Sequence, residues 1–262
     1  MNEVRSLLLA AGTGSRLLPL TEYWPKCLMP IKKIALLEYW LSALFRNDLK
    51  KVIVNIHHHK NIVDEFLSRE NFNNWVDRYY EPKLLGTAKT FSVHSSYFEK
   101  STTMLIHADN WCHCNFADFI YFHQQQRPKN TLITMMTFNT QNPENCGIVE
   151  LDNNGIVNKI HEKKNSHIGN IANAAVYLIE PEIIDWLKKN PNVTDFSTEV
   201  LPNFLGQIST WHNNKIHRDI GEKKMLIAAQ NDPSPSIIWR NKDKWQLDFE
   251  KHDIQNKIFN KD

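Results

Sequence analysis

Near the start of the chain, a run of small residues followed by two cations has the chemistry of a phosphate-binding loop. The small residues are Ala10, Ala11, Gly12, Gly14 and Ser15. They follow an apolar stretch over 4–9 that predicts a buried strand, and they let the backbone approach a phosphate or a base closely. Arg16 and Lys26 add a forked guanidinium and a point-charge ammonium. Together these residues predict a site for a nucleoside triphosphate.

Two familiar glycine loops do not account for this stretch. A P-loop needs Gly-x-x-x-x-Gly-Lys-Ser/Thr, and the chain contains no such run. A dinucleotide-binding loop needs a third glycine three residues after the second, and Leu17 stands there instead.

The longer pattern resembles the NDP-sugar pyrophosphorylases, the nucleotidyltransferase family that makes nucleotide sugars. It reads Ala-Ala-Gly-x-Gly-Ser-Arg-Leu-x-Pro-Leu-Thr over 10–21 and Pro-Lys-x-Leu-x-Pro-Ile over 25–31. Further motifs in family order extend the resemblance over about residues 4–230. The members that the chain resembles most are the mannose-1-phosphate and heptose-1-phosphate guanylyltransferases.

Two aspartates that follow predicted strands are candidate ligands of a divalent cation. Asp109 comes after the apolar run 103–107, and Asp219 after 216–218. One or two carboxylates together with phosphate oxygens are the usual ligands of Mg²⁺, although either aspartate could simply cap the next helix. The resemblance matches both to family motifs whose aspartates bind magnesium, so we expect Mg²⁺ as cofactor at Asp109 and Asp219.

The resemblance also implies roles around the triphosphate. Arg16 would hold the departing β- and γ-phosphates, and Lys26 would neutralise the α-phosphate, with Asp109 completing the catalytic set. The segment 81–88 resembles the family's Glu-Pro-x-x-Leu-Gly-Thr-Ala segment, which borders the base. The residues expected there are Glu81, Gly86 and Thr87.

The acceptor side departs further from the family pattern. The resemblance places four residues at the sugar phosphate: Gly147, Glu162, Lys163 and Asn173. Among their neighbours, Cys146 replaces the usual tyrosine, Lys164 a proline and Ala175 a glycine. The sequence therefore predicts transfer chemistry more firmly than it predicts the acceptor.

The base is a weaker inference from one side chain. An ionised Glu81 only accepts hydrogen bonds, which suits the two donors on the guanine edge and also the single amino donor of cytosine. We therefore expect GTP first and CTP second.

Three functions stay open at this point. The first is a nucleotidyltransferase that joins an NTP, GTP favoured, to the 1-phosphate of mannose, a heptose or another envelope sugar. A cytidylyl- or uridylyltransferase acting on another sugar phosphate, or on phosphocholine, is the alternative. A catalytically silent, nucleotide-sugar-binding regulatory subunit is a third, whereas a glycosyltransferase would need an Asp-x-Asp motif that 109–111 lacks.

Two clusters of metal-ligating residues fit zinc poorly. Consecutive histidines at 57–59 cannot all face one ion in a regular element, and the Cys-His-Cys run at 112–114 lacks a second, separated pair of ligands.

The elements that carry these residues alternate along the chain. Helical and strand patterns predict a Rossmann-like α/β three-layer sandwich with a mixed, mostly parallel central sheet. The predicted strands are 4–9, 51–56, 76–80, 103–107 and 131–138, and the predicted helices are 36–47, 61–67, 87–94 and 116–125. A hairpin at 148–161 opens a small sugar-binding lobe over about 146–210 within a 1–230 nucleotidyltransferase domain. A linker and tail follow at 231–262, which either pack on a neighbouring subunit, giving a homodimer, or cover the sheet of the same chain.

Composition limits the classes of partner and the compartment that we expect for the protein. The 262 residues carry 31 basic and 29 acidic side chains, and a net charge of +2 argues against nucleic-acid binding. No apolar stretch reaches the roughly 18 residues that a membrane span needs. Four cysteines and no signal-peptide pattern indicate a cytoplasmic protein.

Overall fold

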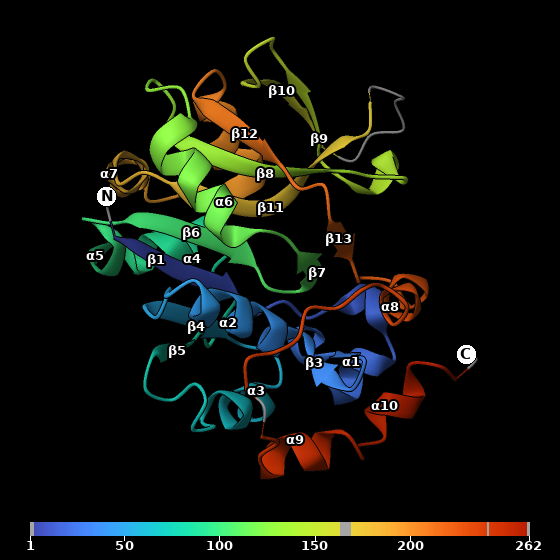
Figure 1. Cartoon of the computed structure of the whole chain (residues 1–262). Coiled ribbons are helices and arrows are strands. Elements are labelled where there is room, and N and C mark those ends of the chain that lie inside the picture. The colour runs from blue at the N-terminus through green and yellow to red at the C-terminus, as the bar shows by residue number, and fades with distance from the viewer. Residues whose placement is uncertain (1–2, 163–168, 240, 261–262) are drawn as a thin grey trace. The chain divides into compact units, whose positions relative to one another are not determined.

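The computed structural model describes residues 3–162, 169–239 and 241–260 (Figure 1). Strands and helices alternate over most of the chain, and the sheet is mixed, mostly parallel and flanked by helices. The predicted α/β class is therefore confirmed. The chain divides into two compact units, each built from segments that are far apart in sequence.

The first unit comprises the residues up to Leu7 together with Leu85–Ile106 and Cys114–Lys215. Its strands are the start of β1 (Val4–Leu9), β6 (Thr102–His107), β8 (Ile133–Asn139), β9 (Ile148–Leu151), β10 (Val157–His161), β11 (Ile171–Ile179) and β12 (Ile208–His212). Its helices are α4 (Thr87–Val93), α5 (Ser95–Phe98), α6 (Phe116–Tyr121) and α7 (Glu182–Lys189).

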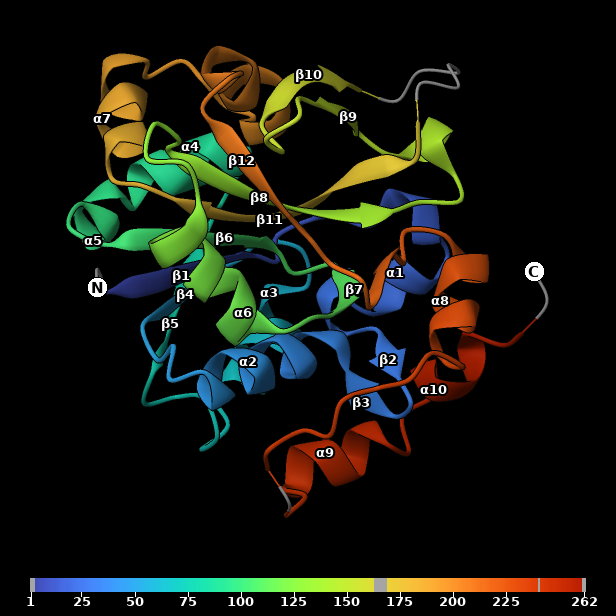
Figure 2. The same ribbon diagram turned by 45° about the horizontal axis from the view of Figure 1, so that its top comes forward.

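Strand β11 is the centre of the sheet in this unit. It runs antiparallel to β6, β8 and β9, while β12 runs parallel to β8. β9 and β10 form the predicted hairpin, which projects beside β12 in Figure 2. β8 and the second half of β11 are buried almost throughout, as expected of strands rich in apolar residues that are covered on both faces.

The second unit comprises Leu8–Leu84, His107–His113 and the residues from Ile216 onward. Its strands are the end of β1, β2 (Pro30–Ile31), β3 (Ile34–Ala35), β4 (Val52–Ile56), β5 (Val76–Tyr80), β7 (Asn110–His113) and β13 (Ile216–Asp219). Its helices are α1 (Leu20–Tyr23), α2 (Leu36–Arg46), α3 (Lys60–Leu67), α8 (Lys223–Ala229), α9 (Lys244–Phe249) and α10 (Ile254–Lys257).

Two pairings in this unit matter for the site. β4 and β5 are parallel, and Glu81, just after β5, donates its N–H to the carbonyl of Ile56 at 2.8 Å. β7 and β13 form a separate antiparallel ladder. In both cases a strand end delivers a predicted site residue.

The C-terminal stretch packs within the second unit. The ring of Trp245 on α9 lies edge-on to Phe66 of α3 at 4.9 Å, and Phe249 stacks on Trp24 at 5.5 Å. Trp239 meets Phe72 edge-on at 5.0 Å. Stacked and edge-to-face aromatic pairs each add to the area they bury, so these rings hold the tail against its own chain.

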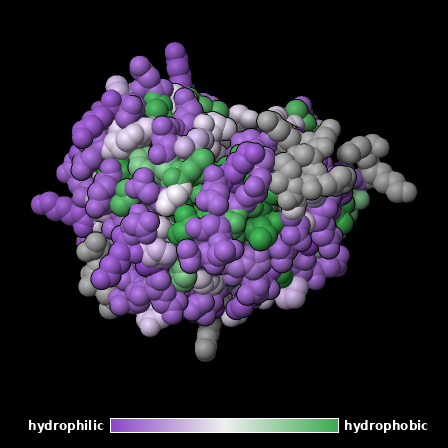
Figure 3. Space-filling model, turned by 90° about the horizontal axis from the view of Figure 1, so that it is seen from above, coloured by the Kyte–Doolittle hydropathy of each residue, from purple (hydrophilic) through white to green (hydrophobic). Residues whose placement is uncertain are grey.

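In the described part of the chain, none of the helices has the length and apolar character needed to cross a bilayer. The face drawn in Figure 3 is mostly hydrophilic, and its hydrophobic side chains gather near the middle.

A network of ion pairs also ties the tail to the rest of the second unit. The Arg69 guanidinium contacts Glu38 Oε2 and Asp243 Oδ2, both at 2.7 Å. Burial raises the pKa of Glu38 even though Arg69 opposes the shift. The side chains of Glu38 and Arg69 are 1% and 5% exposed, whereas that of Asp243 is 35% exposed.

We predict that Glu38→Gln lowers the free energy of unfolding by about 3 kcal/mol, because it removes one charge from a buried pair. Asp243→Asn should cost about 1 kcal/mol or less, because its side chain is 35% exposed and its charge is partly solvated. Urea unfolding of both variants at neutral pH measures the difference. Equal and small losses would contradict the buried pair.

Candidate active site

Lys26 joins two aspartates that are far apart in sequence. Its Nζ lies 2.8 Å from Asp109 Oδ2 and 3.2 Å from Asp219 Oδ1. Arg16 Nη2 contacts the other oxygen of Asp219 at 2.8 Å. All four residues belong to the second unit, so the structure brings together the two cations and two carboxylates singled out from the sequence.

The backbone explains why the carboxylates meet. Asp109 lies in the turn between β6 and β7, and Asp219 ends β13. The β7–β13 ladder pairs Asp219 with Asn110, the residue after Asp109. Trp40 of α2 fixes this turn, because its Nε1 donates to the Asn110 carbonyl at 2.9 Å.

The small-residue loop makes a tight turn at Gly14, which precedes Arg16 and lies against Lys26. Gly14 has φ +65°, and a Cβ there would lie 2.8 Å from Thr21 Cγ2 and 3.0 Å from Lys26 Cβ. Both the conformation and the space therefore require glycine. Ser15 and Arg16 follow on a short 3₁₀ turn.

The start of this loop is held from the neighbouring strand. Ala10 and Ala11 are buried, and Ala10 N–H donates to Asn55 Oδ1 at 2.7 Å. Asn55 Nδ2 donates in turn to Glu81 Oε1 at 3.0 Å. Gly12 faces the metal candidates, since a Cβ there would lie 3.9 Å from Asp109 Oδ2.

Asn55 is a residue that the sequence analysis missed. It is the single amide within the apolar run 52–56 and is almost fully buried. A buried amide needs hydrogen-bond partners. An asparagine inside an apolar strand therefore indicated, from the sequence alone, a residue that fixes neighbouring groups.

The three consecutive histidines anchor the segment between Arg16 and Lys26. His58 and His59 each place Nε2 at the Thr21 carbonyl, at 2.8 and 2.9 Å. Because a carbonyl only accepts hydrogen bonds, both rings donate there. Thr21 Oγ1 donates to the Gly14 carbonyl at 3.0 Å. His57 Nδ1 lies 2.7 Å from the Glu81 carbonyl, so each histidine serves a backbone group.

The shared charges shift the titration of this site. Burial alone would raise the pKa of Asp219, but the charge of Lys26 and the hydrogen bond from Arg16 hold that pKa at about 2. The pKa of Asp109 is lowered in the same way, mainly by Lys26 against the effect of burial. Burial disfavours the charged form of Lys26, yet the two carboxylates raise its pKa. The cluster is therefore ionised at neutral pH.

The donor set suits a hard divalent cation. Mg²⁺ prefers oxygen ligands and is commonly held by one or two carboxylates plus substrate phosphates, and the carboxylates of Asp109 and Asp219 both contact Lys26 Nζ. Within 3–162, 169–239 and 241–260, no group of three or more His, Cys, Asp or Glu side chains could hold a metal ion. The remaining ligands would therefore be phosphate or water oxygens.

Three of the predicted acceptor residues lie together in the first unit. Asn173 N–H donates to the Gly147 carbonyl at 2.9 Å, and a Cβ on Gly147 would lie 3.2 Å from Glu162 Oε1. Asn173 sits where the register of β11 shifts, and its Oδ1 accepts from the N–H of Ala175, which has φ +54°. Such an irregularity re-aims side chains. Lys163 lies outside the described residues.

Gly86 and Thr87 also belong to the first unit. Gly86 precedes α4 with φ +92°, and Thr87 begins that helix. The Thr87 hydroxyl accepts from Phe196 N–H at 2.7 Å and lies 3.3 Å from Asp195 Oδ2. In this structure Thr87 therefore fixes the segment around 194–199.

A family model and a curated relative each match most of the chain. The family model described as "Nucleotidyl transferase" matches residues 5–234. The chain is 23% identical over 234 residues to mannose-1-phosphate guanyltransferase 2 of Candida glabrata, which covers 86% of this chain and 63% of the relative. The chain thus spans less than two thirds of the length of this relative.

Two solved structures share the fold. A Bacillus anthracis protein described as a glucose-1-phosphate thymidylyltransferase, in complex with a sucrose, superposes with a TM-score of 0.77 at 18% identity, covering 89% of this chain and 98% of that one. HddC from Yersinia pseudotuberculosis, complexed with GMP-PN, gives a TM-score of 0.72 at 23% identity, covering 88% and 98%.

We predict that Arg16→Gln raises the pKa of Asp219 from about 2 toward its ordinary value of 3.8, because one of its two cations is lost. Since the folded pKa is depressed, ionised Asp219 stabilises the fold above the ordinary pKa, and this contribution is lost as pH falls toward 2. Carboxyl ¹³C NMR titration of metal-free protein measures the shift. An unchanged Asp219 titration in the variant would contradict the assigned cause.

Proposed function

Because the chain belongs to the nucleotidyl transferase family, we propose that it is an enzyme that joins a nucleoside triphosphate to a sugar 1-phosphate and releases pyrophosphate. The observation that carries the proposal is the convergence of Arg16, Lys26, Asp109 and Asp219 in one unit. Two cations beside two carboxylates that would hold a metal ion are the parts that phosphoryl-group chemistry needs.

The reaction calls for charge neutralisation rather than a covalent nucleophile. An oxygen of the sugar phosphate forms a bond to the α-phosphorus, and the bond from that phosphorus to the oxygen bridging to the β-phosphate breaks. The attacking phosphate is already ionised, so no general base is required. Positioning two polyanions against each other is the main barrier.

Each member of the cluster has a part in that step. Lys26, whose side chain is 5% exposed, is fixed by two carboxylates and would face the α-phosphate. Arg16, whose side chain is about half exposed, holds the departing β- and γ-phosphates. Asp109 and Asp219 would hold Mg²⁺, which when bound supplies further positive charge to the phosphate oxygens.

The histidine anchor sets the spacing of these cations. Thr21 lies between Arg16 and Lys26 in sequence, and its carbonyl is the shared acceptor of His58 and His59. We assign both histidines as positioning residues, because displacements of about 1 Å at a reacting centre cost up to a hundredfold in rate.

GTP is the triphosphate that we favour. Glu81 is buried and receives a hydrogen bond from Asn55 on Oε1, and a carboxylate suits the donor edge of guanine. The guanyltransferase name of the Candida glabrata relative and the GMP-PN bound to HddC point the same way. Mannose or heptose 1-phosphate is the corresponding acceptor.

The experiment that tests the proposal is pyrophosphate release from a matrix of four triphosphates against candidate acceptors. Mannose, heptose and glucose 1-phosphates and phosphocholine form the acceptor set, with Mg²⁺ present. The proposal expects the highest kcat/KM with GTP and a mannose- or heptose-type phosphate. Turnover with CTP or UTP instead of GTP would contradict the assignment of guanine as the base. No turnover with any combination of triphosphate and acceptor would favour a silent regulatory subunit.

We predict that Asp109→Asn and Asp219→Asn each lower kcat by about a hundredfold or more, because the charge that binds the metal and fixes Lys26 is halved. Asp77→Asn, an exposed carboxylate on β5, is the matched control and should retain the wild-type rate. Steady-state pyrophosphate release measures all three. Rates near wild type in both site variants would contradict the assignment of Asp109 and Asp219 as metal ligands.

We also predict that the double variant His58→Leu, His59→Leu lowers kcat by about tenfold. Each single variant should lose less, because the second ring still donates to Thr21. The double glutamine variant keeps an N–H donor at both positions and should recover part of the loss. A purely structural role would lower the melting temperature of the leucine and glutamine variants alike without separating their kcat values.

A further inference from the structure

The end of the chain lies beyond the region that the family model matches. That match stops at residue 234, whereas the chain continues to residue 262 and forms α9 and α10. Both helices belong to the second unit, as does Lys26. α9 contacts two parts of the segment 24–33, which has Lys26 near its start. The helix can therefore influence a residue of the site without belonging to the family match.

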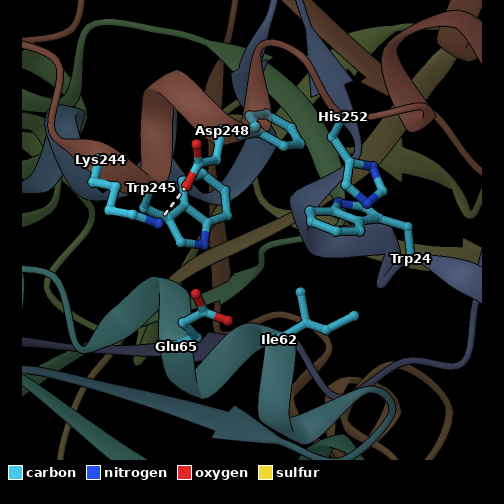
Figure 4. A pocket seen from close by; sticks show the side chains of 8 residues that line it. Trp24, Ile62, Glu65, Lys244, Trp245, Asp248 and His252 are labelled. Atoms are coloured by element: carbon cyan, nitrogen blue, oxygen red, sulfur yellow. Dashed lines mark hydrogen bonds and ion pairs between the residues drawn. The ribbon is translucent and has the colours of Figure 1, made fainter.

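An aromatic contact joins α9 to the start of this segment. Phe249 stacks on Trp24 with ring centroids 5.5 Å apart, and the His252 ring, just past the helix, lies 4.4 Å from the same tryptophan (Figure 4). Trp24 is fixed in turn to the backbone beyond Lys26, because its Nε1 donates to the Leu28 carbonyl at 2.9 Å. α9 therefore packs on the turn that contains Lys26.

A hydrogen bond joins the same helix to the other end of the segment. Gln246 stands three residues before Phe249 on α9, so the two side chains share one face of the helix. Gln246 is 2% exposed, and its Nε2 donates to the Lys33 carbonyl at 2.9 Å. Lys33 lies in the tight turn between β2 and β3, which pair as an antiparallel hairpin. α9 thus holds this hairpin at its tip.

The tip of the hairpin has a backbone conformation that needs such support. Lys32 and Lys33 have φ +49° and +69°, which residues with a side chain adopt rarely and keep only where their surroundings hold them. One glutamine holds each of them: Lys32 N–H donates to Gln230 Oε1 at 2.8 Å, and the Lys33 carbonyl accepts from Gln246. Gln230 lies within the family match and Gln246 beyond it. α9 therefore completes the support of the hairpin.

Two backbone hydrogen bonds connect the hairpin to Lys26. Leu36, just after β3, donates its N–H to the Met29 carbonyl at 3.1 Å, and Met29 donates its N–H to the Lys26 carbonyl at 3.1 Å. From this backbone the Lys26 side chain reaches Asp109 and Asp219. A shift of the hairpin would therefore move the point from which the ammonium is carried.

We propose that α9 is a positioning element for Lys26 and that Gln246 is the positioning residue through which it acts on the hairpin. This role rests on the proposed function, in which Lys26 must meet the α-phosphate at a fixed place. A lysine ammonium is carried on a flexible four-carbon stem, so its position depends on the backbone at one end and on its charge partners at the other. α9 fixes the backbone, and the two aspartates fix the ammonium.

Gln246→Met tests this role, because methionine has a similar length but no N–H donor. Among the described residues, Gln246 Oε1 has no hydrogen-bond partner, so the substitution also removes a buried unsatisfied acceptor and should leave the fold intact. We expect amide hydrogen exchange at Met29 and Leu36 to accelerate by about tenfold. The kcat of pyrophosphate release should fall by about fivefold, with an unchanged KM for the acceptor.

Gln255→Met is the matched control. It makes the same change of residue type but removes a hydrogen bond from α10 to the Phe249 carbonyl, and it should match the wild type in exchange and in kcat. Lys33→Gly separates positioning from a general loosening of the tail, because glycine adopts φ +69° without strain. The double variant Lys33→Gly, Gln246→Met should therefore recover part of both losses.

Three results would overturn the proposal. These are equal exchange at Met29 and Leu36 in Gln246→Met and Gln255→Met, faster exchange in Gln246→Met with an unchanged kcat, or no recovery when Lys33→Gly is added. The exchange measurement needs no turnover. A wild-type enzyme that is inactive with every substrate pair would therefore contradict the proposed function, whereas unchanged exchange in Gln246→Met would contradict the role of α9.

Discussion

The site depends on one buried ammonium that two carboxylates share. A charge as enclosed as that of Lys26 costs several kcal/mol unless opposite charges meet it in good geometry. Asp109 and Asp219 provide them at 2.8 and 3.2 Å, and Arg16 neutralises the outer oxygen of Asp219. Each charge is thus placed by the others, and removing any one takes an opposite charge away from at least one of its neighbours.

That constraint accounts for much of the local architecture. The β7–β13 ladder sets Asp219 beside the turn of Asp109. Gly14 is required because the loop must pass within contact distance of Lys26. In the first unit, the irregular register of β11 at Asn173 orients the predicted acceptor residues in a comparable way. Regular strands bring the chain to the site, and local irregularities of the backbone orient the side chains there.

The sequence predicted the elements well where periodicity was strong. Strand 4–9 and strand 76–80 match the structure residue for residue, and the hairpin at 148–161 is confirmed. Asp109 could be placed at a strand end because the apolar run 103–107 stops just before it, and Asp219 because it follows the predicted strand 216–218. Their convergence on Lys26 needed the tertiary pairing of β7 with β13, which no local pattern encodes.

Other features escaped for the same reason. His58, His59 and Asn55 contact backbone groups of the distant loop at 10–21, so their roles appear only in three dimensions. Each compact unit is assembled from separate segments, whereas a linear reading can mark only contiguous boundaries. The sequence showed that the C-terminal tail is rich in aromatic residues but not what those residues pack against. In the structure they pack against α3 and Trp24.

The most direct test of this account is a crystal structure with Mn²⁺ and a non-hydrolysable triphosphate, phased to locate the metal by its anomalous signal. The account predicts one strong peak at about 2.2 Å from carboxylate oxygens of both Asp109 and Asp219, with Lys26 against the phosphates. A metal bound away from either aspartate, or a triphosphate bound away from Arg16 and Lys26, would contradict it.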